Sequence, residues 1–600
     1  MTETVEPPAS SHRRRRRRST LRRVLLTVAL LLVVVIAGVA WVGVDAIRAR
    51  GELKAAAAQI QVLRGQVVKG DRPAAVATLR SLQNHAAAAN AGTHGPHWSA
   101  VRMLPRLGPN LRAVQTVSEV IDGLALHALP ALMDATSLVD PKTLAPVDGR
   151  VDLKPLVKAA PQVVAADAEV QSAVRRLDAV RPDELLAAVA TPLADLRTQV
   201  GKVATTTATA ARAVRLLPPM LGADGPREYL MLVQNNAEQR ATGGIPGSVI
   251  LLQATGGRVK VVQQRSGNTL GGLAKPVLPL TAQERALFGD DLGKTMLDVT
   301  FTPDFPRSAQ LARAIWAKKV GGEVDGVLSI DPGALARVLG ATGPVKLPTG
   351  QQLTERNAEE LLLNTVYRQI ADPTLQDAFF ATTAATVFDA MLGGQGEPAK
   401  VVDALAQAAR EGRLMVWSAH KEEQALLAGT VLSGELVGVD GDSPVIGVYL
   451  NDGTAAKIGY YLRTDVVATS TGCGPGGSQA VAVKVTLTNT APANAADLPA
   501  YLTGGGNVVP KGEVRMNVLL YAPSGGQVDD VRVSRGPQGV FSQTHNGLAV
   551  VGRTVQLKPG ERVVIDYDLH TGPGQTDTPV LRVTPVTLEN VVTKATSRCP

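Results

Sequence analysis

Near its start the chain carries an apolar run that no charged residue interrupts, from Val24 to Val44. As a helix, a run of this length rises about 30 Å, which is the thickness of the hydrocarbon core of a bilayer. We therefore predict a single N-terminal transmembrane helix at 24–44. An uncleaved anchor is preferred to a cleaved signal peptide, whose apolar part has about 7–15 residues and ends at a small-residue cleavage site.

The basic residues in front of this run predict its orientation. Arg13–Arg18 are consecutive and Arg22 and Arg23 adjoin the run, whereas Asp45 follows it. Because basic flanks stay on the cytoplasmic side, we expect residues 1–23 to be an unstructured cytoplasmic tail. The predicted localisation is the cell membrane, single-pass, with the N-terminus cytoplasmic and the bulk of the chain extracytoplasmic. Membrane lipid is the first predicted partner.

From 45 to 217 the apolar positions recur every three or four residues, which predicts amphipathic helices. Frequent prolines divide this stretch into short helical segments. We expect a membrane-proximal helical domain, either a compact bundle or a coiled-coil stalk. The prolines and the lack of sustained heptads favour the bundle.

From 218 to 435 apolar runs alternate with helical patterns. The predicted strands are 227–234, 248–253, 258–262, 324–330 and 345–348, and the predicted helices are 308–319, 332–339, 354–367, 376–392 and 399–411. Asp331 before Pro332 is typical of a helix N-cap. Such alternation predicts an α/β domain with an at least partly parallel sheet.

From 436 to 600 an alternation of period two dominates. The predicted strands are 457–463, 480–489, 513–521, 528–533, 548–557 and 562–569. Turn residues separate them at short spacing, which predicts a β-sandwich. The complete prediction is a multidomain α+β protein with a single N-terminal transmembrane helix, a helical membrane-proximal bundle, a central α/β domain and a C-terminal β-sandwich.

Charge and cysteine content narrow the possible functions. Of the net charge of +9, residues 1–23 carry +6, so the outer part is nearly neutral and we predict no nucleic-acid partner. Cys473 and Cys599 predict one disulfide across the C-terminal domain, with two free thiols as the alternative. We predict no metal site, because the scattered histidines lack metal-ligand spacing. The sequence leaves the oligomeric state open.

The densest group of polar and charged residues follows the first predicted strand of the α/β domain. We expect a glycine-rich loop at 235–248 whose backbone N–H groups face a ligand, with Arg240 gripping a carboxylate or phosphate and Arg265 joining the same pocket. The alternative for each residue is a structural role in a turn, strand end or helix cap. The ligand-binding candidates are Asn235, Asn236, Glu238, Arg240, Thr242, Gly243, Gly244, Arg265, Asp304, Arg307 and Asp325.

The segment 235–248 resembles the signature of the bacterial domain of unknown function 4012 family. In that family an element N-x-A-E-x-R-x-T-G-G follows a strand, as it does here after Tyr229-Leu-Met-Leu-Val. Later segments of the chain fit the same family, at 302–309, 324–327, 343–345 and 451–461. The resemblance covers residues 220–500 and implies a membrane-anchored bacterial protein, but it implies no activity.

A weaker resemblance links the order of strands and arginines, and the segment 324–345, to the LytR-CpsA-Psr family. Its members are single-span membrane proteins that transfer polyprenyl-pyrophosphate-linked glycans to the cell wall, with Arg and Asp around a pyrophosphate and a divalent metal. The resemblance aligns Arg240 and Arg265 with two arginines of that family. The aspartates that should follow them are replaced by Thr242-Gly243 and by Ser266, which removes metal ligands.

Together these patterns favour an envelope protein that binds or scaffolds a cell-envelope glycan or a lipid-linked precursor, with no cofactor and no assigned catalytic residue. The alternative is a glycan phosphotransferase that acts on polyprenyl-pyrophosphate-linked polymers and needs Mg²⁺. Convergence of both arginines with Glu238, Asp304 or Asp325 in one pocket would favour the enzyme.

Overall fold

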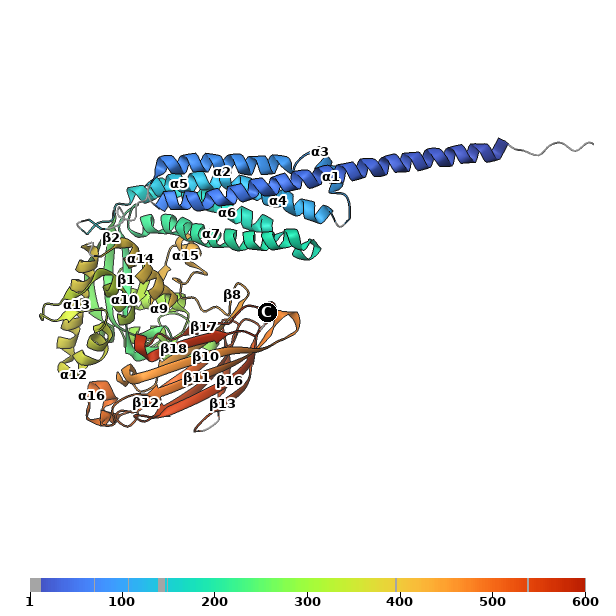
Figure 1. Cartoon of the computed structure of the whole chain (residues 1–600). Coiled ribbons are helices and arrows are strands. Elements are labelled where there is room, and N and C mark those ends of the chain that lie inside the picture. Colours follow the sequence, from blue (N-terminus) through green and yellow to red (C-terminus); the bar gives the residue numbers. More distant parts are fainter. Residues whose placement is uncertain are drawn as a thin grey trace, which may run out of the picture. The chain divides into compact units, whose positions relative to one another are not determined.

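The computed structural model describes residues 12–68, 71–105, 107–138, 146–147, 149–393, 396–536 and 539–598. It is a multidomain α+β structure, with helices in the N-terminal part and several sheets in the C-terminal part. The chain forms two compact units (Figure 1). The first comprises Met1–Asp140 and Lys154–Arg215, and the second comprises Pro141–Leu153 and Leu216–Pro600.

The first unit is helical. Its elements are α1 (His12–Val68), α2 (Arg72–Gly92), α3 (Pro96–Val101), α4 (Gly108–Gly123), a π-helical segment (Leu124–Ala128), α5 (Leu129–Leu138), α6 (Lys154–Asp178) and α7 (Ala187–Met220). Ala56 of α1 packs with Leu82 and Ala86 of α2 in one apolar cluster. Val120, Leu177 and other residues of α4, α6 and α7 form a second cluster. These shared cores make a bundle of several helices, although Pro161 lies inside α6 and does not divide it as expected.

The helix α1 contains the predicted membrane span 24–44 without a break, but it already begins at His12. The expectation of an unstructured tail is therefore wrong from residue 12 onward, because arginine is a good helix former and extends the helix; residues 1–11 lie outside the described part. A further stretch, Gly108–Asp134, is also long and apolar enough to cross a membrane. This is weak support for insertion, since its buried Val120 and Ala125 belong to the bundle core. Membrane insertion at 24–44 and its orientation stay predictions.

The second unit opens with a five-stranded sheet in the order β3-β2-β1-β4-β7. The strands are β1 (Arg227–Arg240), β2 (Gly243–Thr255), β3 (Arg258–Ser266), β4 (Gly326–Ile330) and β7 (Leu414–Ser418). The pair β1–β4 is parallel and the other pairs are antiparallel, so the sheet is partly parallel, as predicted. The strand β7 is not among the predicted strands, although its run Leu414-Met-Val-Trp417 is apolar.

The helices of this region cover both faces of the sheet. They are α8 (Ala282–Phe288), α9 (Phe305–Lys319), α10 (Pro332–Thr342), α11 (Ala358–Glu360), α12 (Val366–Gln369), α13 (Pro373–Leu392), α14 (Pro398–Arg410) and α15 (Lys421–Leu427), with a small hairpin of β5 (Val345–Lys346) and β6 (Gln352–Leu353). Leu230 and Leu232 of β1 join the core under α9, whereas Tyr229 and Met231 pack toward α13. The predicted helix 354–367 is divided by a π-helical segment, Leu361–Thr365.

The C-terminal strands form two sheets, in the orders β13-β16-β11-β10-β18 and β14-β15-β12-β9-β17. The strands are β8 (Val439–Asp440), β9 (Ser443–Asp452), β10 (Leu462–Cys473), β11 (Gln479–Asn489), β12 (Val514–Tyr521), β13 (Gln527–Val533), β14 (Phe541–His545), β15 (Leu548–Leu557), β16 (Arg562–His570), β17 (Val580–Val583) and β18 (Val591–Thr596), and a short helix, α16 (Ala500–Thr503), lies between β11 and β12. Buried Val448 and Val518 of one sheet pack with Val485 and Ile565 of the other, which makes a sandwich.

The predicted strand 457–463 is partly wrong. A 3-10 turn occupies Ile458–Tyr461, and β10 starts only at Leu462. Gly459 in this turn lies against β1, where an added Cβ would come 2.0 Å from Oε1 of Gln239. This close tertiary approach, which a local pattern does not encode, replaces the strand. The predicted disulfide stays a prediction, because Cys599 lies outside the described residues.

The α/β region and the sandwich share one core, although we expected two domains that meet near residue 435. Tyr449 and Tyr521 on the outer face of a sandwich sheet belong to the same apolar cluster as Leu230 and Phe305 of the α/β region. Pleated strands send alternate side chains to opposite faces, so one sheet fills both the sandwich core and this seam. The two layers therefore fold as a single unit.

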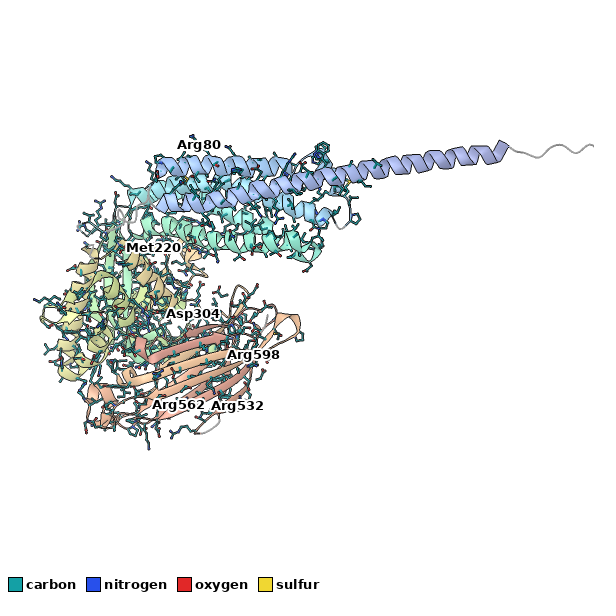
Figure 2. The ribbon with its side chains drawn as sticks, viewed as in Figure 1. Arg80, Met220, Asp304, Arg532, Arg562 and Arg598 are labelled. Carbon is teal, nitrogen blue, oxygen red and sulfur yellow. The ribbon has the colours of Figure 1, made fainter. Side chains whose placement is uncertain are left out.

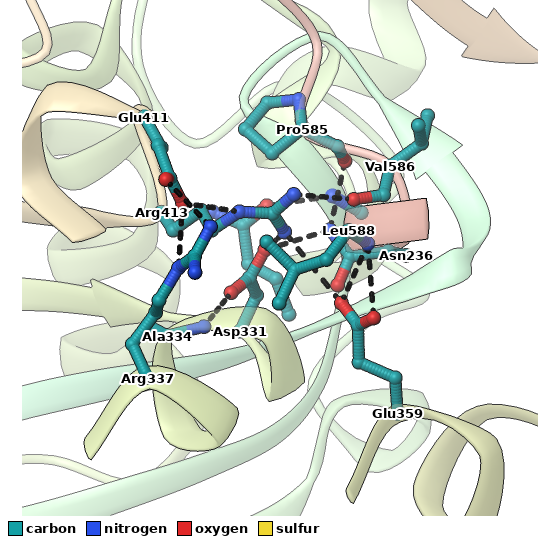
Figure 3. A network of polar contacts seen from close by, with 12 residues as sticks. Asn236, Asp331, Ala334, Arg337, Glu359, Glu411, Arg413, Pro585, Val586 and Leu588 are labelled. Carbon is teal, nitrogen blue, oxygen red and sulfur yellow. Dashed lines mark hydrogen bonds and ion pairs between the residues drawn. The ribbon is translucent and has the colours of Figure 1, made fainter. Parts of the chain in front are cut away.

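A buried polar network, here called the Arg413 network, crosses the same seam (Figure 3). Arg413 is 3% exposed, and its Nη1 lies 2.8 Å from Oδ2 of Asp331. Its Nη2 donates to the backbone carbonyl of Val586 at 2.6 Å, in the segment after β17. Glu359 accepts the backbone N–H of Leu588 at 2.9 Å. Asp331 also caps α10 by accepting the N–H of Ala334 at 2.7 Å, as its position before Pro332 predicts.

Replacement of Arg413 by methionine should destabilise the second unit by about 3–5 kcal/mol, because it leaves the buried Asp331 carboxylate without its cation. Arg285→Met is the control, since Arg285 and its partner Asp290 are both about half exposed, and an exposed pair is worth about 0–1 kcal/mol. Thermal and urea unfolding of the purified protein measure both effects. Equal losses in the two variants would show that the network does not hold the seam.

Candidate functional site

The candidate loop at 235–248 is a β-hairpin. β1 continues through Asn235 and Asn236 to Arg240, and β2 begins at Gly243 after a two-residue turn. Register shifts between Asn235 and Gln239 bend β1 at this point. The expectation of a free glycine-rich loop is corrected, because paired strands run almost to its tip.

The glycines serve the packing of this hairpin. The N–H of Gly244 donates to Oε1 of Gln234 at 2.7 Å, and a Cβ at Gly244 would lie 2.0 Å from the carbonyl oxygen of Asn235. Gly243 has a φ of +139°, a conformation that favours glycine. Thr242 beside it is buried. The N–H of Gly244, which we expected to face a ligand, is thus engaged within the protein.

Arg240 lies in a chain of alternating charges, here called the charge chain. Its Nη2 is 3.1 Å from Asp298 and 3.5 Å from Glu238, and its guanidinium stacks on the ring of Phe301 at 4.4 Å. Glu238 in turn lies 3.2 Å from Nζ of Lys457. The order is therefore Asp298, Arg240, Glu238, Lys457, in which each interior member contacts two opposite charges.

Lys457 comes from the sandwich and enters the α/β layer between two aromatic rings. Its Nζ lies 5.4 Å from the ring centroid of Tyr367 and 5.3 Å from that of Tyr501, and the residue is 5% exposed. Burial alone lowers the pKa of Lys457, but Glu238 and the two tyrosines raise it above its ordinary value. The amine is therefore a fixed cation at neutral pH.

The two asparagine candidates connect this region to its neighbours. Asn235 donates from Nδ2 to the hydroxyl of Tyr367 at 2.5 Å. Asn236 donates to Asp331 at 3.0 Å and to the carbonyl of Pro585 at 2.8 Å, so it belongs to the Arg413 network. Both side chains are at least 90% buried and bond to protein groups. Asn235 is the one that also faces the cavity described below.

The other candidates lie in separate places. Asp304, labelled in Figure 2, precedes α9 and accepts the N–H of Leu436 at 3.1 Å; its side chain makes no cap bond to the helix. Arg307 binds Glu284 at 2.7 Å. Asp325 precedes β4 and lies 3.2 Å from Arg227, at the start of β1. The structure therefore brings Glu238 and Arg240 together but gathers neither Asp304 nor Asp325 with them.

A cavity of about 480 Å³ lies between the sheet and α13. Much of its wall is apolar, and Leu362 and Leu363 of the π-helical segment contribute to it; such segments are frequent at functional sites. Arg265 and Lys457 are the cations among its lining residues, whereas Arg240 is not part of the wall. This cavity, rather than the hairpin tip, is the candidate binding site.

The cavity has a polar end and an apolar end. Through β2, Asn235 aligns with Ile245 and Ser266 with Ser248, so the carboxyl ends of β1 and β3 lie at the same edge. The polar wall residues near that edge include Asn235, Gln264, Arg265, Ser266, Asn268 and Lys457. Toward the other end, Met231, Ala384 and Phe388 share an apolar cluster. Such a shape suits a molecule with a charged head and an apolar tail.

Sequence reasoning missed Lys457, Tyr367 and Tyr501, which surround the polar end. Lys457 lies within the segment 451–461 that supports the family resemblance, and this was its one available signal. Its contact with Glu238 spans 219 positions of sequence, so no local spacing points to it. Arg265 lines this cavity, whereas Arg240, with which we expected it to share a pocket, does not.

Asp452, at the end of β9, is a buried carboxyl next to the charge chain. Its Oδ2 accepts the N–H of Thr454 at 3.1 Å and of Ala455 at 2.9 Å. Burial, and then the nearby charge of Glu238, raise its pKa to about 7. The folded protein therefore holds this proton to a higher pH than the unfolded chain, in which aspartate titrates near pH 4. This contribution to stability is lost as the pH rises from about 4 to about 7.

Asp452→Asn should therefore weaken the loss of thermal stability between pH 4 and pH 8, and at pH 8 the variant should be more stable than the natural protein. One pKa unit corresponds to about 1.4 kcal/mol, so we expect a gain of at least about 1 kcal/mol. Melting temperatures across this pH range provide the measurement. Asp290→Asn, at the surface beside Arg285, is the control. Parallel curves for natural protein and Asp452→Asn would contradict the assignment.

Comparison with known proteins gives one match. No curated protein and no solved structure matches the chain. A family model matches residues 224–367, a segment that begins just before β1 and ends in α12. It includes the hairpin, Arg240, Arg265 and Tyr367, but not Lys457. Residues 224–367 match the family described as a protein of unknown function, DUF4012.

Proposed function

We propose that this protein is a membrane-anchored, extracytoplasmic envelope protein that binds the apolar chain of a lipid-linked envelope precursor. The observation that carries the proposal is the cavity between the sheet and α13, with its apolar interior and charged end. The predicted anchor at 24–44 would hold this site near a bilayer, where lipid-linked glycans are found and ATP is not expected.

The size of the cavity supports a single chain as the occupant. Its volume of about 480 Å³ falls within the range of about 300–1,000 Å³ that is usual for small-molecule sites. A water molecule occupies about 30 Å³ of liquid, and a methylene group is of similar size, so the space holds roughly sixteen such groups. Burial of each methylene contributes about 0.8 kcal/mol, which is enough for specific binding of one chain.

The geometry does not favour the phosphotransferase alternative. Arg240 is opposite Gly243 and Arg265 is opposite Val249, so six residues of β2, about 20 Å at about 3.4 Å per residue, separate their backbones. Arg240 is held by Glu238 and Asp298. Within the described residues no group of three or more acidic, histidine or cysteine side chains is arranged to hold a metal ion. The similarity to the LytR-CpsA-Psr family stays a hypothesis.

Filling the apolar end of the cavity should weaken chain binding. We expect Ala384→Trp to weaken binding of farnesol by at least tenfold, because Ala384 lines the cavity and tryptophan occupies its space. Thr382→Trp on the exposed side of the same helix is the matched control. Isothermal titration of full-length protein in nanodiscs, corrected for empty nanodiscs, provides the affinities. Equal affinities in both variants would overturn the cavity as the site.

Protease treatment tests the predicted topology. The cells are stripped of their outer layers so that the protease reaches the outer face of an intact cell membrane. With the N-terminus in the cytoplasm, protease should digest the regions after residue 45 and leave a short membrane fragment that contains residues 1–44. An epitope at the N-terminus should therefore stay protected until the membrane is permeabilised. Loss of that epitope from intact cells, with survival of the later regions, would show the reverse orientation.

A further inference from the structure

The polar end of the cavity is built by both layers of the second unit. β1 and β3 contribute Asn235 and Arg265, whereas the sandwich contributes Lys457 and Tyr501. Lys457 is the buried cation of this wall, and Arg265 is the exposed one. A buried charge acts across a low dielectric and therefore attracts a ligand more strongly than a charge at the rim.

Lys457 keeps the capacity to attract a second anion. An ammonium group has three N–H donors, and Glu238 accepts one of them at 3.2 Å. The rings of Tyr367 and Tyr501 hold the cation by its positive charge without supplying a counter-charge. Glu238 is itself shared, because Arg240 lies 3.5 Å from its other oxygen. Lys457 is thus only partly neutralised.

We propose that Lys457 binds the phosphate of a single-chain prenyl phosphate whose chain lies in the cavity. The inference deepens the function proposed above and rests on it. The head group would lie at the seam between the sandwich and the α/β layer, near the partly exposed Tyr501, so that a group attached to the phosphate has a way to solvent. The tail would run along α13 toward Phe388.

Two ligands with the same chain measure the contribution of the phosphate head group separately from that of the chain. Farnesyl phosphate and farnesol carry the same chain, and the phosphate alone distinguishes them. We expect full-length protein in nanodiscs to bind farnesyl phosphate at least tenfold more tightly than farnesol. In Lys457→Met, which keeps the length of the side chain, this preference should fall to less than threefold while farnesol binding changes less than threefold. Lys484→Met on the exposed surface of β11 is the control.

A second variant should act in the opposite direction. Glu238→Gln removes the anion that competes for Lys457, so we expect farnesyl phosphate to bind at least threefold more tightly and farnesol to bind as before. A gain of affinity of this kind does not arise from misfolding. Lys457→Arg, which keeps the positive charge, should retain most of the preference for the phosphate.

The outcomes are distinct. If farnesol and farnesyl phosphate both bind but Lys457→Met keeps the preference, the role of Lys457 is overturned and the chain-binding function stands. If Lys457→Met does not fold, an unchanged or weaker phosphate affinity in Glu238→Gln overturns the role of Lys457. If the natural protein binds neither ligand, the chain-binding function fails and the inference fails with it.

Discussion

The second unit depends on the burial of charge at the seam where the α/β layer meets the sandwich. Arg413 and Asp331 are both almost fully buried, and neither would be stable there alone. Backbone groups after β17 complete the network, because the Val586 carbonyl and the Leu588 N–H bond to Arg413 and Glu359. Each layer thus satisfies the buried polar groups of the other, so neither layer would keep these groups paired if it folded by itself.

The Arg413 network also fixes the local structure around the start of α10. Asp331 caps α10 and binds Arg413 with its second oxygen, so the start of that helix is fixed by a residue that directly precedes β7. Asn236 adds a donor from β1. These bonds connect the carboxyl ends of β1 and β4 with the start of α10 on this side of the cavity. Burial raises the pKa of Glu359 to about 7, although Arg413 opposes the shift.

Local patterns predicted much of the fold and little of the site. The continuous apolar run Tyr229-Leu-Met-Leu-Val is visible in the sequence, because both faces of this strand are covered by apolar cores. The cap at Asp331 is visible for the same local reason. The distant partners of Arg240 and Glu238 were not predictable, since Asp298 reaches Arg240 and Lys457 reaches Glu238 from segments far along the chain. Arg413 was likewise missed, because its contact with Val586 spans 173 positions. Charged residues that the sequence indicates as ligand-binding residues can therefore form ion pairs with each other in the folded protein.

The Arg413 network and the charge chain both lie at the seam, but they differ in their capacity to bind a ligand. In the Arg413 network, the carboxylates of Asp331 and Glu411 and the Val586 carbonyl surround the cation, so the network holds the layers together and leaves little for a ligand. At the charge chain, Lys457 ends the series beside a cavity and shares its single carboxylate with Arg240. A ligand that binds there contacts both layers at once. Because such a ligand binds only the assembled seam, its binding free energy adds to the stability of the whole unit.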